Sequence, residues 1–166
     1  MLKLYNTLTK SKEFADFTSK EVNIYLCGPT VQSSPHIGHG RSAVVFDFLV
    51  RYLNYTGKEV VFARNITDID DKIIEKSLKQ GITHNELTTE VSKEFNAAYS
   101  ALNCKKPNHE PKATESIEEI IELIKLLEEK EIAYQSSSRV YFDISKYDNY
   151  LELSGRSHED LISGTR

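Results

Sequence analysis

The sequence predicts an α/β fold built on a pair of parallel strands. Two stretches rich in β-branched and aromatic residues, Val22–Cys27 and Glu59–Arg64, predict strands. Between them, apolar residues recur at helical spacing from Gly38 onward, and Gly57 follows as a candidate C-terminal cap. Because a strand, a helix and a strand follow one another so closely, the simplest connection is a right-handed crossover, which leaves the two strands parallel.

Two further helices are predicted after the second strand, over Ile66–Lys79 and over Asn85–Leu102. Gly81 is expected to end the first of them. We expect Thr67 to be able to cap this helix, with Asp68 opening its first turn, which is compatible with a ligand contact of the same residue. The second helix carries its apolar residues on one side, namely Leu87, Val91, Phe95, Ala98 and Leu102.

The stretch Cys104–Lys112 contains two prolines and is predicted to be a linker or an ordered loop. Beyond it, isoleucines and leucines spaced like one helix face, with a capping box at Ser116–Glu119, predict an amphipathic helix up to Leu127. Tyr134 and Val140–Asp143 predict two short strands around a polar turn. No element is predicted for the last twenty residues.

Composition limits the classes of function. The chain has 166 residues, of which 39% are hydrophobic and 28% charged, so a folded domain is expected rather than intrinsic disorder. Its 21 basic and 25 acidic residues give a net charge of −4, which excludes a global basic field for nucleic acid but not a local patch. The most apolar stretch, Ser42–Leu53, is interrupted by charges and is too short for a membrane span. Two cysteines and a polar N-terminal region predict a cytoplasmic protein.

The loop after the first predicted strand carries the candidate chemistry. In an open parallel sheet, ligands bind where a strand ends and the chain turns into a helix. Gly38 and Gly40 have no side chain to block a close approach, and the helix start behind them is expected to present unpaired N–H groups and a positive dipole end. A phosphate group would fit there.

His36 and His39 are three residues apart, so both rings can face one ligand. Each ring can donate a hydrogen bond to a phosphoryl oxygen. A His-x-x-His pair beside glycines is also compatible with an ordinary helix cap or with two surface histidines, and four residues alone do not decide between these interpretations. The position inside a predicted strand–helix–strand unit favours the nucleotide site.

His36–Ile37–Gly38–His39 resembles the HIGH signature of class I aminoacyl-tRNA synthetases. The wider run from Cys27–Gly28–Pro29 through Pro35 to His39 is similar to cysteinyl-tRNA synthetases, and a second block, Arg64–Ile74, matches the same family in the same order. The resemblance covers the whole chain but only the N-terminal part of that family. One departure is Gln32–Ser33–Ser34, where the family commonly has aromatic residues.

The resemblance implies an N-terminal half of a Rossmann-like (HUP-type) nucleotide-binding domain at residues 1–103. It implies an α+β connective insertion at 104–166, incomplete at its C-terminal end. The implied reaction is activation of L-cysteine by ATP, with magnesium, to cysteinyl-adenylate and its transfer to tRNA(Cys). Two alternatives stay open, namely a catalytically silent ATP-binding or interaction fragment and a related ligase that delivers cysteine to a small amine.

The same resemblance assigns residues to roles. His36 and His39 are the implied catalytic residues, and the run from His36 to Gly40, with Ile37 and Gly38 between them, is the implied ATP-binding segment. Cys27, Gly28 and Thr67 are implied to bind cysteine, and Cys27 to be one of four zinc ligands whose other three lie in the missing half.

Residues outside these motifs receive simpler interpretations. Cys104 is expected to be structural, whereas Arg41 is compatible with either a phosphate contact or a helix cap. Three more histidines are expected at the surface, namely His84, His109 and His158. Three lysines are expected to be solvated rather than to contact tRNA, namely Lys105, Lys106 and Lys112. Two open sheet edges would favour self-association.

Overall fold

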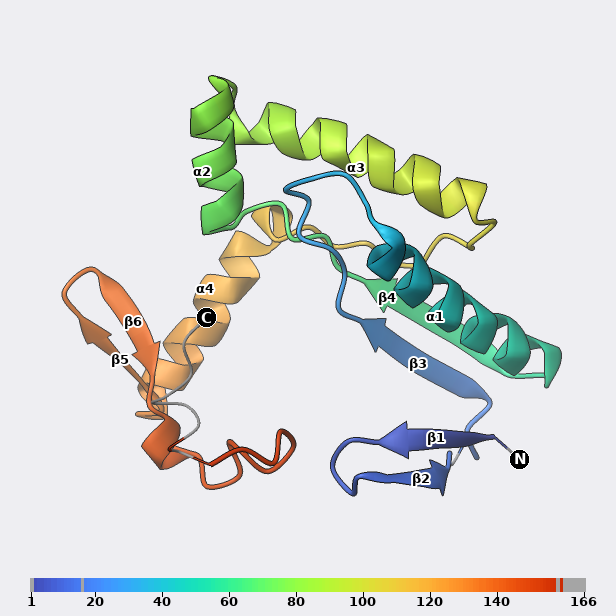
Figure 1. Cartoon of the computed structure of the whole chain (residues 1–166). Helices are drawn as coiled ribbons and strands as arrows, with labels where there is room; N and C mark the ends of the chain where they lie inside the picture. Colours follow the sequence, from blue (N-terminus) through green and yellow to red (C-terminus); the bar gives the residue numbers. More distant parts are fainter. Residues whose placement is uncertain (1, 16, 158, 160–166) are drawn as a thin grey trace. The chain divides into compact units, whose positions relative to one another are not determined.

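The computed structural model describes residues 2–15, 17–157 and 159. Clustering of contacts divides the chain into two compact units. The first unit is Thr18–Ile117, and the second combines Met1–Phe17 with Glu118–Arg166. Figure 1 shows the elements of both. The domain boundary expected between residues 103 and 104 rests on the resemblance to the family and not on contacts within the chain. It stays a prediction.

The strand–helix–strand prediction is confirmed in the first unit. β3 (Glu21–Leu26) and β4 (Glu59–Arg64) pair in parallel along their whole length, and α1 (Ile37–Tyr55) connects them and lies against β4. Gly57 follows the C-cap Thr56 with a φ of 84°, a left-handed conformation that glycine adopts without steric cost. The α/β class is therefore established for this unit, with a parallel sheet of two named strands.

The stretch 104–112 is an ordered loop, one of the two predicted outcomes. It forms parallel bridges with the end of β4 and with the residues just beyond it. The N–H of Arg64 donates to the carbonyl of His109 at 2.9 Å, and the N–H of Ile66 donates to the carbonyl of Pro111 at 2.8 Å. Backbone pairing thus continues along the outer edge of β4, where a solvent-exposed linker would leave these groups unpaired.

The helix after β4 begins later than predicted. α2 spans Asp71–Gln80, and its N-cap is Asp70, whose carboxylate accepts a hydrogen bond two residues further on. The prediction that Thr67 caps a helix starting at Asp68 is wrong. The end of this helix is as predicted, because Gly81 adopts a left-handed φ of 67°.

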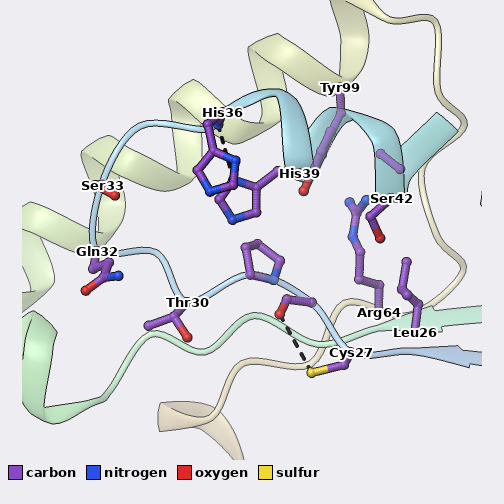
Figure 2. A pocket seen from close by; sticks show the side chains of 13 residues that line it. Leu26, Cys27, Thr30, Gln32, Ser33, His36, His39, Ser42, Arg64 and Tyr99 are labelled. Carbon is purple, nitrogen blue, oxygen red and sulfur yellow. Dashed lines mark hydrogen bonds between the residues drawn. The ribbon is translucent and has the colours of Figure 1, made fainter. Parts of the chain in front are cut away.

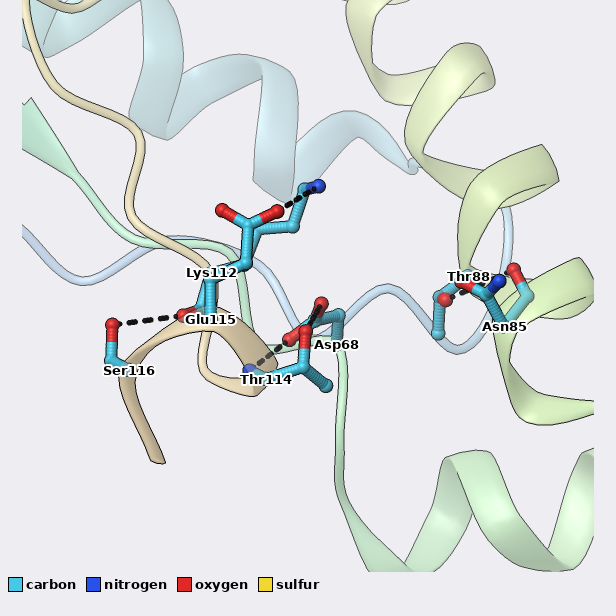
Figure 3. A network of polar contacts seen from close by, with 7 residues as sticks. All are labelled: Asp68, Asn85, Thr88, Lys112, Thr114, Glu115 and Ser116. Atoms are coloured by element: carbon cyan, nitrogen blue, oxygen red, sulfur yellow. Dashed lines mark hydrogen bonds and ion pairs between the residues drawn. The ribbon is translucent and has the colours of Figure 1, made fainter. Parts of the chain in front are cut away.

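Thr67 and Asp68 hold neighbouring loops instead. The N–H of Thr67 donates to the carbonyl of Pro29 at 3.0 Å, and its carbonyl accepts from the N–H of Val31 at 3.1 Å. The carboxylate of Asp68 accepts from the N–H of Thr114 at 2.9 Å and from its hydroxyl at 2.5 Å (Figure 3). Asp68 is therefore a buried anchor for the short 3-10 helix η1 (114–116) and not a partner of a helix dipole.

α3 (His84–Ala101) supplies most of the core of the first unit. It begins at a capping box in which Thr83 and Glu86 bond each other's backbone N–H. Leu87, Val91 and Phe95 are buried on one face of this helix, as predicted. Tyr99 is buried there as well, whereas Leu102 is 48% exposed. The core cluster contains Val31, Ala43, Ile73, Leu87, Val91, Phe95 and Tyr99. This core joins the loop after β3 to α1, α2 and α3.

The second unit begins with a hairpin that the sequence analysis did not predict. β1 (Lys3–Asn6) and β2 (Ser11–Phe14) pair antiparallel, and Lys10 in the turn adopts a positive φ of 53°. Its strands are short and largely exposed, so they lack the alternation of apolar and polar residues on which strand prediction depends.

α4 (Ile117–Glu129) confirms the predicted amphipathic helix, but not its capping box. It follows η1 directly, and the hydroxyl of Ser116 donates to the carbonyl of Lys112 at 3.0 Å. The predicted C-terminal hairpin is confirmed as β5 (Ala133–Ser136) and β6 (Arg139–Phe142), and the 3-10 helix η2 (Ile144–Lys146) follows.

His158 and most of the last residues lie outside the described part of the chain. In the ranges that the structure describes, no helix combines the length and the apolar character that a bilayer crossing requires.

Candidate nucleotide-binding site

A cavity of about 290 Å³ lies in the first unit, between the carboxyl end of β3 and the start of α1 (Figure 2). This is the position at which the sequence predicts a ligand. The loop after β3 forms one side, and α1, the end of β4 and α3 contribute the rest. The lining residues are Leu26, Cys27, Gly28, Pro29, Thr30, Gln32, Ser33, His36, His39, Ser42, Ala43, Arg64 and Tyr99.

The two histidines lie together at the start of α1. Their ring centroids are 3.9 Å apart, with the ring planes inclined by 33°. His36 is the N-cap, and its Nδ1 accepts from the N–H of Gly38 at 3.1 Å. In return, Nδ1 of His39 accepts from the N–H of His36 at 3.2 Å. The pair therefore forms a capping box made of two imidazoles.

This capping box fixes the tautomer of both rings. A nitrogen that accepts a hydrogen bond carries no proton, so Nδ1 is unprotonated in both histidines and the proton of each neutral ring is on Nε2. Both Nε2 atoms are then N–H donors, and both rings line the same cavity. The helix-cap interpretation and the ligand interpretation left open by the sequence are therefore compatible, because each uses a different nitrogen.

The ring of His39 is supported from behind by α3. It contacts the ring of Phe95 edge to face at 4.9 Å between centroids, and Phe95 contacts Tyr99 at 5.7 Å. Burial, and secondarily the positive charge that His36 can carry, lower the pKa of His39 below its usual 6.5. His39 is therefore held as a neutral donor near pH 7.

The expected unpaired N–H groups at this helix start are not found at Gly38, His39 or Gly40. The N–H of Gly38 donates to the side chain of His36, and the N–H groups of His39 and Gly40 donate to the carbonyl of His36 at 2.9 and 3.3 Å. A β-carbon on Gly38 would lie 2.9 Å from the His36 ring, so this glycine makes room for the cap. Ile37 is 90% exposed, and neither Ile37 nor the two glycines lines the cavity.

Gly28 permits a close approach of two loops. A β-carbon there would lie 1.6 Å from the backbone oxygen of Asn65. The Asn65 side chain completes the contact, because its Oδ1 accepts from the N–H of Gly28 at 2.8 Å and from the Tyr25 hydroxyl at 3.1 Å. Its amide nitrogen donates to Thr67 Oγ1 at 3.2 Å. Gly28 lines the cavity, whereas Thr67 lies behind it.

Cys27 is exposed, lines the cavity and is a free thiol whose recorded contact is a 3.9 Å approach to the carbonyl of Gly28. Among the residues that the structure describes, no three histidine, cysteine, aspartate or glutamate side chains are placed to hold a metal ion. The described residues thus supply one thiol and do not by themselves form a zinc site.

The sequence analysis assigned no role to Arg64, which lines the cavity and is buried. Its Nη2 donates to Oε1 of Glu110 at 2.5 Å, and its Cζ lies 4.3 Å from the centroid of Tyr99. The sequence did contain a signal for this role, because Arg64 is a charged residue at the carboxyl end of β4, where ligands bind in parallel sheets.

The residues outside the motifs are placed as follows. Cys104 packs against the core, as expected for a structural cysteine, and burial raises the pKa of its thiol. His84 and His109 are exposed, as predicted. Lys112 forms an ion pair with Glu115 at 2.7 Å, and Lys105 and Lys106 are exposed.

Comparison with known proteins gives the same family as the motifs. The family described as tRNA synthetases class I (C) catalytic domain matches residues 13–166. The chain is 46% identical over 168 residues to a cysteine–tRNA ligase of Vibrio vulnificus (strain YJ016), covering 100% of this chain and 36% of that protein. It is 48% identical over 167 residues to a cysteine–tRNA ligase of Maridesulfovibrio salexigens, covering 99% and 34%.

The chain spans about a third of the length of these curated relatives, and in both comparisons practically the whole chain is aligned. The matched family covers the β3–α1–β4 unit, the cavity and the histidine pair. The chain therefore belongs to the family of class I cysteinyl-tRNA synthetase catalytic domains.

Proposed function

We propose that this chain carries part of the catalytic site of a cysteine–tRNA ligase, which activates L-cysteine with ATP and transfers it to tRNA(Cys). The observation that supports this most directly is the histidine pair, with both Nε2 donors on one cavity at the carboxyl end of a parallel strand. The names of the relatives support the substrate class.

In this proposal the histidines act by position and charge. The Nε2–H groups of His36 and His39 donate to phosphoryl oxygens of ATP and stabilise the charge that develops when the carboxylate of cysteine attacks the α-phosphate and pyrophosphate leaves. In the proposed ATP-binding segment from His36 to Gly40, the contacts to the nucleotide come from the two histidine rings, because Ile37, Gly38 and Gly40 do not line the cavity. The chain need not form a covalent intermediate, because positioned donors suffice for such a transfer.

Cys27, Gly28 and Thr67 are proposed to form the cysteine side of the site. Cys27 and Gly28 line the cavity, and Thr67 acts through the Asn65 contact that holds Gly28. A zinc ion bound through Cys27 would hold the substrate thiol and deprotonate it, which favours cysteine over serine. Because the described residues provide only this one thiol, we assign no step of the reaction to the metal.

The larger architecture is proposed on the same basis. The β3–α1–β4 unit would be part of a Rossmann-like, HUP-type half-domain at residues 1–103, with 104–166 as the connective insertion. Among the described strands, β3 has a partner on one side only, so self-association through its free edge is proposed as well. Magnesium would accompany ATP, and the cytoplasm is the proposed location.

The test is cysteine-dependent exchange of pyrophosphate into ATP, together with calorimetric titration of ATP. Because the chain spans about a third of the length of its relatives, we expect it to be inactive by itself. In the intact enzyme, His39→Ala should lower exchange by roughly 10² to 10³, as removal of one oxyanion donor does in other enzymes. His84→Ala, an exposed histidine, is the matched control. ATP binding without exchange would identify a nucleotide-binding module, and charging of a small amine instead of tRNA would identify the related ligase. Absence of ATP binding would contradict the proposal.

A further inference from the structure

Arg64 is the buried charge of the candidate site. Its side chain is 7% exposed, and it rises from the end of β4 toward Tyr99 and Ser42, which line the same cavity (Figure 2). Glu110, on the loop that pairs with β4, accepts a hydrogen bond from its Nη2, and the Tyr99 ring lies against its Cζ. The guanidinium is therefore held from two sides at a fixed place.

One donor of this guanidinium is not used. Nε of Arg64 is buried and has no hydrogen-bond partner among the residues that the structure describes. A buried donor without an acceptor is unfavourable, and such a group in a folded protein calls for an explanation. An acceptor that does not belong to the chain, such as a bound ligand or a water molecule, would satisfy it.

The cavity that Arg64 lines suits an anion. None of its thirteen lining residues is a carboxylate, and its charged lining residue is Arg64. The counter-ion Glu110 does not line this cavity but lines a separate, smaller one, together with Arg64 and Tyr99. His36 and His39 direct two more N–H donors at the same space.

We propose that Arg64 is an anion-binding residue of this site, donating from its guanidinium to a phosphate or a carboxylate of the occupant. The inference rests on the proposed function and adds the residue that recognises the charged group. Glu110 and Tyr99 act as positioning residues, because the carboxylate pairs with the guanidinium and the ring lies against it. The contacts His39–Phe95–Tyr99–Arg64 link two donor residues of the site, His39 and Arg64, through α3.

The test measures binding of four ligands to the 166-residue chain by calorimetry: ATP, adenosine, cysteine and cysteamine. Adenosine lacks the phosphates, and cysteamine lacks the carboxylate, so the two pairs identify which anion Arg64 recognises. Arg64→Gln should weaken binding of ATP, of cysteine or of both by at least about tenfold, the usual effect of losing a hydrogen bond to a charged group. Adenosine and cysteamine should bind as before.

Two further variants separate ligand binding from a structural role. Glu110→Gln keeps an acceptor for Nη2 but removes the counter-charge, so anion binding should be retained or strengthened. Arg51→Gln is the matched control. Like Arg64, Arg51 pairs with a carboxylate, in this case from its Nε to Asp47 at 2.6 Å, but it does not line the cavity. It should leave the affinity for all four ligands unchanged.

The outcomes are distinguishable. If the wild-type chain binds ATP and cysteine and Arg64→Gln binds both equally well, the inference is wrong and the proposed function stands. If Glu110→Gln weakens ATP and adenosine alike, the ion pair is only structural and the inference is again wrong, even if Arg64→Gln does not fold. If the wild-type chain binds neither ATP nor cysteine, both proposals are overturned.

Discussion

At the scale of single residues, His36 and His39 both form the N-terminal cap of α1 and line the cavity. A histidine N-cap is less usual than serine, threonine or aspartate, and here it orients the second ring as well. The spacing of His36 and His39 predicted that both rings can face one ligand, and in the structure both line one cavity. The hydrogen bonds at Nδ1 were not predictable from spacing, since they depend on the rotamer of each ring.

The pKa of His39 provides a direct test of this arrangement. We expect His39 to titrate below 6.5, and His36→Asn, which retains a good N-cap residue, to raise its pKa by removing a nearby positive charge. Because the pKa of His39 is lower in the folded chain, the unfolded state binds a proton at His39 more tightly than the folded state does. The contribution of His39 to the free energy of unfolding is therefore fully present above pH 6.5 and decreases as the pH falls toward the folded pKa. NMR titration of the ring measures it. A pKa at or above 6.5 would contradict the described environment.

Gly28 is predicted to tolerate no side chain. Gly28→Ala places a methyl group against the backbone of Asn65 and should lower the free energy of unfolding by roughly 3 kcal/mol. Gly40→Ala is the control, because its new methyl group meets only the flexible end of Leu102 at 3.2 Å and alanine favours a helix. Urea unfolding measures both. Equal effects would show that the approach at Gly28 is not tight.

At the scale of elements, local patterns predicted the strands and helices of the β3–α1–β4 unit because apolar periodicity and turn residues are local signals. The start of α2 was misplaced since Asp68 looks like a first-turn residue but is bound by Thr114, which is 46 positions away in the sequence. The docking of loop 104–112 on β4 has the same long-range origin.

Asp68 is predicted to hold η1 in place. Asp68→Ala leaves two donors of Thr114 without an acceptor, so the amide of Thr114 should lose about 1–3 kcal/mol of protection against hydrogen exchange. Asp143 makes the same two contacts to Ser145 in η2, but these hydrogen bonds are exposed. Asp143→Ala should therefore have a smaller effect on the amide of Ser145. Similar losses in both variants would argue against the role of burial.

At the scale of the whole molecule, the chain contains two compact units, and the candidate site belongs to one of them. The family and the class of fold were predictable because the two motif blocks are specific. The β1–β2 hairpin was not predicted. The surroundings of Arg64, on which its proposed role rests, became visible only when β4, α3 and the loop 104–112 were placed together.

Residues 18–117 are predicted to fold by themselves and to keep the site, because all lining residues and the core cluster lie within this range. A chain of this length can bury a sufficient core. Cooperative urea unfolding and an unchanged ATP affinity are the expected results. Loss of cooperativity would mean that the second unit is needed for folding.

The most direct measurement is NMR of the chain with nitrogen-15-labelled histidines during titration with ATP and, separately, with adenosine. We expect both rings to be protonated on Nε2 in the free chain, and ATP but not adenosine to shift the Nε2 resonances of His36 and His39. Protonation on Nδ1, or Nε2 resonances that do not respond at ATP concentrations that saturate the chain, would contradict a site in which these two donors bind the phosphates.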